Sequence, residues 1–274
     1  MLMRLPPPDG SRDARIEDPT NRWVIHLAGR MLLPLALRLG ISANAISIVG
    51  FLSGVGAFWC FLRWDEPAMA TLAFLLCIGW MIADGLDGMV ARATRTASPL
   101  GRFLDGVCDH GVFLLLYLSM GFALNTPFVW VFGTFAGLVH TVQASLYEGE
   151  RMRFHRRVKG DPLPPRVRPP NALVRAYDSI AGSLDRLAEP FDRLLARSPD
   201  PRRLGEIYGD AATPPMRLMA LLTNNVRVIA MYLACLAGDP TLFWWFELLP
   251  LSAVTAIGIL WHRRVEARLI GRSV

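Results

Sequence analysis

The sequence is poor in cysteine: four occur among 274 residues, and none belongs to a CxxC pair. All of them lie in or beside apolar runs, at Cys60, Cys77, Cys108 and Cys235. Cysteine in such a setting behaves as a small buried apolar side chain. We therefore expect neither a disulfide framework nor a thiolate metal site.

The first 20 residues lack a long apolar run; they are polar and Pro-rich, so we expect no cleavable signal peptide. A concentrated basic patch is also missing. The formal net charge is +6, but the basic residues fall in short segments between apolar runs. That distribution is typical of membrane topology signals and argues against a nucleic-acid partner.

Apolar residues dominate the composition: they make up 53% of the chain, with eight Trp and fourteen Phe. Six stretches are apolar and long enough to cross a bilayer. They are roughly residues 45–62, 68–92, 101–124, 127–148, 216–237 and 241–261. We therefore predict an all-α integral membrane protein with six transmembrane helices.

The chain divides into four parts on this pattern. A polar segment (1–20) precedes residues 21–148, which hold the first four predicted spans. An insert (149–215) separates these from residues 216–274, which hold the last two spans and a basic tail.

Two amphipathic helices are expected outside the spans. Residues 21–40 mix basic and apolar side chains and predict a helix bent near Pro34, which lies in the cytoplasmic interface or packs on the rest of the protein. In the insert, residues 177–197 predict a helix broken near Pro190. That segment lies on the membrane, caps the cytoplasmic mouth or is a solvated excursion.

Four aspartates lie in residues 84–109, between apolar runs. Asp84 and Asp87 are three residues apart, and Asp105 and Asp109 are four apart, so each pair lies on one helix surface. Two helices meeting here would gather four carboxylates, which repel by about 4 kcal/mol per pair at about 4 Å and an effective dielectric near 20. Acidic groups at membrane depth mark function. The set is either partly protonated, as in a proton relay, or holds a hard divalent cation; the alternative is solvated loop aspartates.

Written as a pattern, this stretch is D-x-x-D-G-x-x-A-R-x₈-G-x₃-D-x₃-D. Its fixed residues are Asp84, Asp87, Gly88, Ala91, Arg92, Gly101, Asp105 and Asp109. The pattern resembles the signature of the CDP-alcohol phosphotransferases, also called CDP-alcohol phosphatidyltransferases, and the resemblance covers roughly residues 20–150 and 216–262. It implies a membrane enzyme that moves a phosphate-linked group from a CDP-alcohol to an acceptor hydroxyl and releases CMP.

The resemblance also implies roles for the aspartates. Asp84, Asp87 and Asp105 would be the core ligands of the metal, expected to be two Mg²⁺ or Mn²⁺ ions. Asp109 would complete the site and act as general base on the acceptor hydroxyl. A homodimer is expected as well.

The remaining motif positions are expected to bind the donor. Gly88, Ala91 and Gly101 would leave space for the cytidine diphosphate against helix backbone, and Arg92 would contact phosphate. The alternatives are ordinary small-residue helix packing and an interfacial topology charge.

Polar residues within two later spans are candidates for the acceptor site. They are His140, Gln143 and Tyr147 on the fourth span and Asn224, Asn225 and Arg227 on the fifth. Hydrogen bonding between helices explains them equally well. We expect His110 and His140 to be core histidines and not metal ligands, because the carboxylates already supply a hard-cation site.

Orientation follows from the basic residues. The turns at 63–67, 125–126 and 238–240 hold a single base, whereas the opposite side carries the bases of the motif, the insert and the tail. The positive-inside rule places the active site and both termini in the cytoplasm. We expect a bacterial inner membrane.

The acceptor alcohol is not fixed by the sequence. The run DGVCDH departs from the D-P-x-A-D-K typical of phosphatidylglycerophosphate synthases, and SPLG is similar to choline and ethanolamine phosphotransferases. We favour CDP-diacylglycerol as donor and a small polar alcohol as acceptor, with a CDP-choline/ethanolamine-type enzyme acting on a lipid alcohol as the alternative. A proton- or ion-coupled transporter is disfavoured because the outer halves of the spans are almost wholly apolar.

Overall fold

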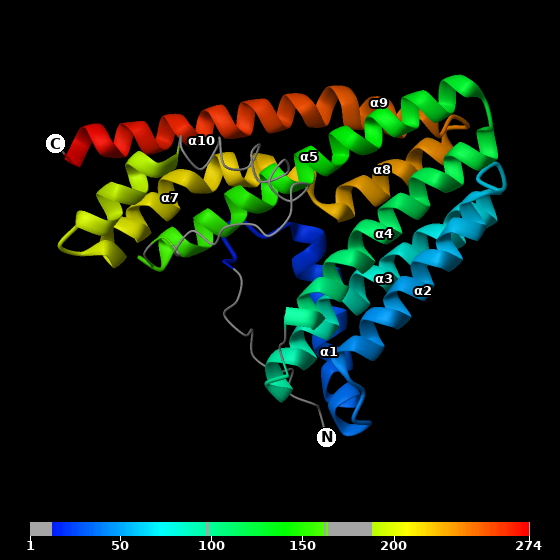
Figure 1. Ribbon diagram of the computed structural model, residues 1–274, viewed down its shortest axis with the longest axis horizontal. Helices are drawn as coiled ribbons and strands as arrows, with labels where there is room; N and C mark the ends of the chain where they lie inside the picture. The colour runs from blue at the N-terminus through cyan, green and yellow to red at the C-terminus, as the bar shows by residue number, and fades with distance from the viewer. Residues whose placement is uncertain (1–12, 97–98, 162, 164–187, 274) are drawn as a thin grey trace. The chain divides into compact units, whose positions relative to one another are not determined.

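The computed structural model describes residues 13–96, 99–161, 163 and 188–273, and among these it leaves the side chains of 99–107, 109, 272 and 273 undescribed. Within the described residues every regular element is a helix and no strand occurs (Figure 1), which confirms the all-α fold class. The chain forms two compact units. The first is built from residues 18–140 and 224–248, and the second from residues 141–223 and 249–274 with the short segment 12–17.

The first unit begins with a π-helical turn, η1 (Asn21–Ile25), and α1 (His26–Arg38). A helix therefore covers most of the stretch 21–40, and α1 runs continuously through Pro34; its amphipathic role stays a prediction. It packs on α3: a Cβ at Gly29 would lie 3.3 Å from Met89 Cε. This contact supports the alternative in which the helix packs on the rest of the protein; its place in the membrane interface stays a prediction.

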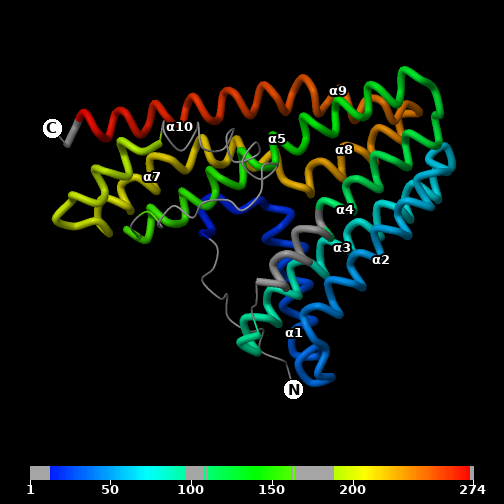
Figure 2. Tube along the Cα trace, in the orientation of Figure 1, coloured from blue at the N-terminus to red at the C-terminus, as the bar shows by residue number. Residues whose placement is uncertain are grey.

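Two long helices, α2 (Ala43–Phe61) and α3 (Pro67–Thr94), lie side by side in antiparallel directions (Figure 2). Ser42 caps α2 by accepting a hydrogen bond from the Ala45 amide at 3.2 Å. The small residues of α2 permit the close approach: a Cβ at Gly50 would lie 2.9 Å from Ala83 Cβ of α3.

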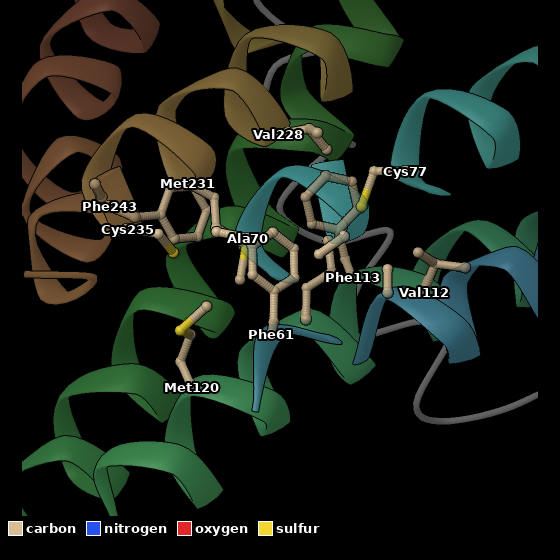
Figure 3. Packing of buried hydrophobic residues seen from close by; sticks show 14 of the residues in the cluster. Phe61, Ala70, Cys77, Val112, Phe113, Met120, Val228, Met231, Cys235 and Phe243 are labelled. Atoms are coloured by element: carbon tan, nitrogen blue, oxygen red, sulfur yellow. The ribbon is translucent and has the colours of Figure 1, made fainter. Parts of the chain in front are cut away.

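The other helices of this unit are α4 (Pro99–Leu124), the first part of α5 (Pro127–Val158), α8 (Asn224–Leu236) and α9 (Thr241–Phe246), which continues into the π-helical η3 (Glu247–Leu251). α4 meets α2 where a Cβ at Gly54 would lie 2.4 Å from Val112 Cγ2. Phe61, Phe113, Met231 and Phe243 belong to the apolar core that these helices share (Figure 3). Cys77 and Cys235 are buried in the same core, which confirms their apolar role.

The second unit contains the rest of α5, a helical stretch at 188–197, α7 (Pro201–Met219) with η2 (Ala220–Leu222), and α10 (Ser252–Ser273). Asp200 caps α7 through the Arg203 amide at 3.0 Å. The predicted helix at 177–197 lies mostly outside the described residues; its described part is helical through Pro190.

A charged network is buried in this unit around Arg157, whose side chain is fully enclosed. Arg157 donates to both carboxylate oxygens of Asp192 at 2.8 and 2.9 Å and to Glu266 at 2.5 Å. Burial raises the pKa of Asp192, but the hydrogen bonds from Arg157 and Arg156 outweigh that effect and hold the pKa below the usual value. The network ties α10 and the 188–197 helix to the end of α5.

Four helical runs are long and apolar enough to cross a membrane: α2, α3, α5 and the run Thr241–Gly271. The fifth predicted span, 216–237, stays a prediction: Pro201–Leu222 and Asn224–Leu236 are long and apolar enough only as a pair, and the pair is bent at the break between them. The bend lies at Thr223, whose backbone is extended and therefore ends the helical hydrogen bonding. The described apolar section of α4, His110–Leu124, is shorter than a span, so six spans stay a prediction.

Candidate functional site

The second half of α3 carries the first five residues of the aspartate motif, as the spacing predicts. Asp87 is buried, with 6% of its surface exposed, while Asp84 is partly buried one turn earlier. Gly88 and Ala91 are partly buried, and Arg92 is exposed. One helix therefore presents two carboxylates, two small residues and a guanidinium within nine residues.

A serine from the neighbouring helix contacts this motif. Ser47 of α2 is buried, and its hydroxyl donates to Oδ2 of Asp87. Sequence reasoning missed this residue. The available signal was a hydroxyl on the first predicted span, one turn before the small residue Gly50.

The side chain of Arg92 folds back along α3 over Gly88. A Cβ at Gly88 would lie 3.1 Å from Nη1 of Arg92, so the absence of a side chain at 88 lets the guanidinium lie close to the helix. Helical side chains point toward the N-terminus, which here is the direction of Asp87. The guanidinium of Arg92 therefore lies over Gly88, the residue that follows Asp87 in the motif.

The donor atoms on α3 fit a hard divalent cation. Asp84 and Asp87 supply carboxylate oxygens one turn apart, and oxygen ligands are those that Mg²⁺, Mn²⁺ and Ca²⁺ prefer. Among the described side chains, no group of three or more His, Cys, Asp or Glu is placed to hold a metal. Two carboxylates alone do not complete such a site.

The rest of the motif lies on α4. The helix spans Gly101, Asp105 and Asp109, so the two aspartates are one helical turn apart, but all three side chains lie outside the described ones. The meeting of four carboxylates, and the roles assigned to these three residues, stay predictions.

The polar residues of the later spans make bonds between helices. His140 Nδ1 lies 3.2 Å from Oε1 of Glu247, and Arg227 donates to Oε2 of the same carboxylate at 2.5 Å. All three side chains are buried, which confirms His140 as a core histidine. Glu247 was not predicted, although it is the only acid within the apolar run 241–261.

Two other members of the polar sets, Gln143 and Asn225, bond to another helix and to the N-terminal segment. Gln143 donates to Ser252 at 3.0 Å, and Asn225 donates to Thr20 at 2.9 Å. These bonds favour the helix-to-helix interpretation over acceptor contacts. His110 is exposed, so the expectation that it is a core residue was wrong.

Comparison with known proteins gives a family match that includes the motif: residues 40–161 match the family described as CDP-alcohol phosphatidyltransferase. A Thermococcus kodakarensis protein named bifunctional IPC transferase and DIPP synthase is 28% identical over 152 residues, which is 53% of this chain and 31% of that protein. Cholinephosphotransferase 1 of Rattus norvegicus is 34% identical over 105 residues, covering 34% and 26% of the two chains.

A third relative is archaetidylinositol phosphate synthase of Pyrococcus horikoshii, 36% identical over 72 residues, or 26% of this chain and 36% of the relative. In all three cases the match spans less than two fifths of the relative's own length. The similarity therefore covers only a part of each relative.

Proposed function

We propose that this protein transfers a phosphatidyl or other substituted phosphoryl group from a CDP-alcohol to the hydroxyl of an alcohol, because residues 40–161 match the CDP-alcohol phosphatidyltransferase family. CMP would be the second product. The apolar helices and the family together indicate an integral membrane protein. The observation that carries the proposal is the pair of carboxylates, Asp84 and Asp87, on one face of α3 inside the matched region.

We propose Asp84, Asp87, Asp105 and Asp109 as the residues that would hold two divalent ions, Mg²⁺ or Mn²⁺. Such ions, when bound, would neutralise charge on the diphosphate and stabilise the transition state. Arg92 would donate to diphosphate oxygens, since a guanidinium binds phosphate in a bidentate manner.

The small residues of the motif would admit the nucleotide. Gly88 and Ala91 would let the cytidine diphosphate approach α3 beside the guanidinium, and Gly101 would serve the same purpose on α4. Asp109 would accept the proton of the acceptor hydroxyl as its oxygen attacks the phosphorus and CMP departs. The matched α4 sequence supports these roles.

CDP-diacylglycerol is the proposed donor and a small polar alcohol the proposed acceptor. The similarity to cholinephosphotransferase 1 favours a second candidate, transfer from a soluble CDP-alcohol to a lipid alcohol. The two candidates differ in which substrate carries the lipid, so they predict activity with different substrate pairs. We also propose a cytoplasmic active site, from the distribution of basic residues, and a homodimer.

The test is CMP release by the purified protein in detergent. One arm supplies CDP-diacylglycerol with serine, inositol, inositol phosphate or glycerol phosphate, and the other supplies CDP-choline or CDP-ethanolamine with diacylglycerol. We expect one arm to release CMP, and EDTA to abolish the release. No CMP from any pair would contradict transfer, while activity in excess EDTA would contradict only the metal requirement.

Variants separate the assigned roles. Asp84→Asn should lose both nucleotide binding and turnover, whereas Asp109→Asn should keep binding and lose turnover by roughly 10²–10⁴-fold, as for a missing general base. Asp65→Asn is the matched control, because this aspartate is exposed in the turn between α2 and α3. Equal loss of binding in Asp84→Asn and Asp109→Asn would make Asp109 a metal ligand and not the base.

A further inference from the structure

We propose that Ser47 is a positioning residue for the divalent-metal site, acting through Asp87. The inference rests on the proposed function, because it assigns Ser47 a task only if Asp87 binds a cation. The family motif does not include Ser47, which lies on another helix, 40 residues from its partner.

The contact is specific in chemistry. The hydroxyl of Ser47 has one proton and two neighbours: Oδ2 of Asp87, at hydrogen-bond contact, and the carbonyl of Ala43, at 3.2 Å. A charged carboxylate is the stronger acceptor and is also the nearer one. The proton is therefore donated to Asp87, and the hydrogen bond to that carboxylate is favoured over the bond to the carbonyl of Ala43 in the same helix.

The contact is also built into the packing of α2 on α3. The two helices run antiparallel with Gly50 against Ala83, three residues after Ser47 and four before Asp87. Two turns further along α2, Ser53 donates to the Leu76 carbonyl at 2.9 Å. Because these contacts fix the register of the helices, the serine hydroxyl is held at Asp87 by backbone placement and not by a flexible side chain.

A hydrogen bond to one oxygen fixes the rotation of a carboxylate. Both Ser47 and Asp87 are buried, with 9% and 6% exposed, so water does not readily replace the bond if it is lost. Groups that orient a metal-binding side chain in this way typically contribute 10–100-fold to metal affinity or activity. Ser47 would therefore set the direction in which Asp87 presents its oxygens to the ion.

The experiment uses three substitutions at position 47 and one control. Ser47→Ala removes the hydroxyl, and Ser47→Thr keeps it. Ser47→Val is the isosteric partner of threonine without the hydroxyl, so comparing Thr with Val cancels effects of β-branching and volume. Ser53→Ala is the control: it also removes a hydroxyl of α2 that donates to α3, but the acceptor there is the backbone carbonyl of Leu76 and not a carboxylate.

The measurement is Mn²⁺ binding to the full-length protein in detergent, followed by electron paramagnetic resonance without substrate, together with the thermal unfolding temperature without metal. We expect Ser47→Ala and Ser47→Val to bind Mn²⁺ roughly 10–100-fold more weakly. Ser47→Thr and Ser53→Ala should remain within about threefold of the unsubstituted protein, as their carboxylate keeps its donor. The metal-free unfolding temperature should be lower for Ser47→Val than for Ser47→Thr, because the buried carboxylate of Asp87 loses its donor; Mn²⁺ affinities are therefore compared at a temperature at which both variants are folded.

Two negative results are distinguishable. If the unsubstituted protein binds Mn²⁺ and Asp87→Asn abolishes the binding, but Ser47→Val binds like Ser47→Thr, the positioning role is overturned and the metal site stands. If the unsubstituted protein and Asp84→Asn both fail to bind Mn²⁺, the proposed metal dependence fails and the role of Ser47 fails with it.

Discussion

Replacing Arg157 by methionine should loosen the second unit while leaving the first intact. Methionine keeps much of the side-chain volume but removes the charge and every donor. The substitution deletes the hydrogen bonds to Asp192 and Glu266 and the bond to the Ala188 carbonyl at 2.9 Å. Two buried carboxylates then lose a cation that is fully enclosed in the native fold.

The magnitude follows from what remains. Breaking a buried ion pair by removing one partner costs about 3–5 kcal/mol, because the other charge stays buried. Here Arg156 still donates to Asp192 at 2.6 Å and Arg263 still donates to Glu266. We therefore expect the lower end, about 3 kcal/mol, which corresponds to roughly a 10²-fold higher opening equilibrium.

Hydrogen exchange of the protein in detergent measures this opening locally. We expect peptides from 188–197 and from α10 to exchange about 100-fold faster in Arg157→Met, with peptides of α2 and α3 unchanged. Arg193→Met is the control, because Arg193 pairs with Glu189 at 2.9 Å on the exposed side of the same stretch and such pairs contribute about 0–1 kcal/mol. Exchange within threefold of the unsubstituted protein would refute the assignment of Arg157 as the centre of the network.

Three further outcomes follow from contacts described above. Gly88→Leu should weaken binding of a cytidine nucleotide while Gly88→Ala should not, because the nearest atom, 3.1 Å away, is the flexible end of an arginine; equal binding in both would place the nucleotide elsewhere. Gly54→Ala should lower the free energy of unfolding by about 1–3 kcal/mol, because the new Cβ would lie 2.4 Å from Val112. Gly56→Ala is the control in thermal unfolding: it should lose less, because its Cβ would meet the flexible end of the Leu76 side chain. The pKa of Asp192 is depressed in the folded protein, so its contribution to stability is present above about pH 4 and is lost as the pH falls below that value. Lowering the pH should therefore accelerate hydrogen exchange of residues 188–197 less in Asp192→Asn than in the unsubstituted protein.

Local signals in the sequence predicted the helices near the motif well. The apolar run that starts near residue 45 predicts the start of α2 within two residues, since the helix begins at Ala43. The spacing of Asp84 and Asp87 predicts one helix surface, and the structure places both residues on α3. Hydropathy and spacing are properties of neighbouring residues, so one sequence suffices to recognise them.

Side-chain contacts that depend on how two helices align could not be predicted from the sequence. Ser47 and Asp87 are 40 residues apart, and Arg227 and Glu247 belong to different helices, so no local pattern links either pair. The helix α7 was also missed, because charged residues cover its exposed side and one of their partners, Arg15, is 191 residues from Glu206. Its end at Thr223 interrupts an apolar run that reads as one continuous span.

The first unit has a consequence for where a working fragment could be cut. The family match ends at residue 161, yet the unit takes residues 224–248 from beyond it. A Cβ at Gly133 would lie 2.8 Å from Trp244 Cζ2, and Glu247 is the carboxylate beside His140. A chain that ended after the matched region would lack the helices that pack against Gly133, and His140 would lose its contact with Glu247. A shortened chain that keeps this unit must therefore include residues 224–248 as well as the matched region.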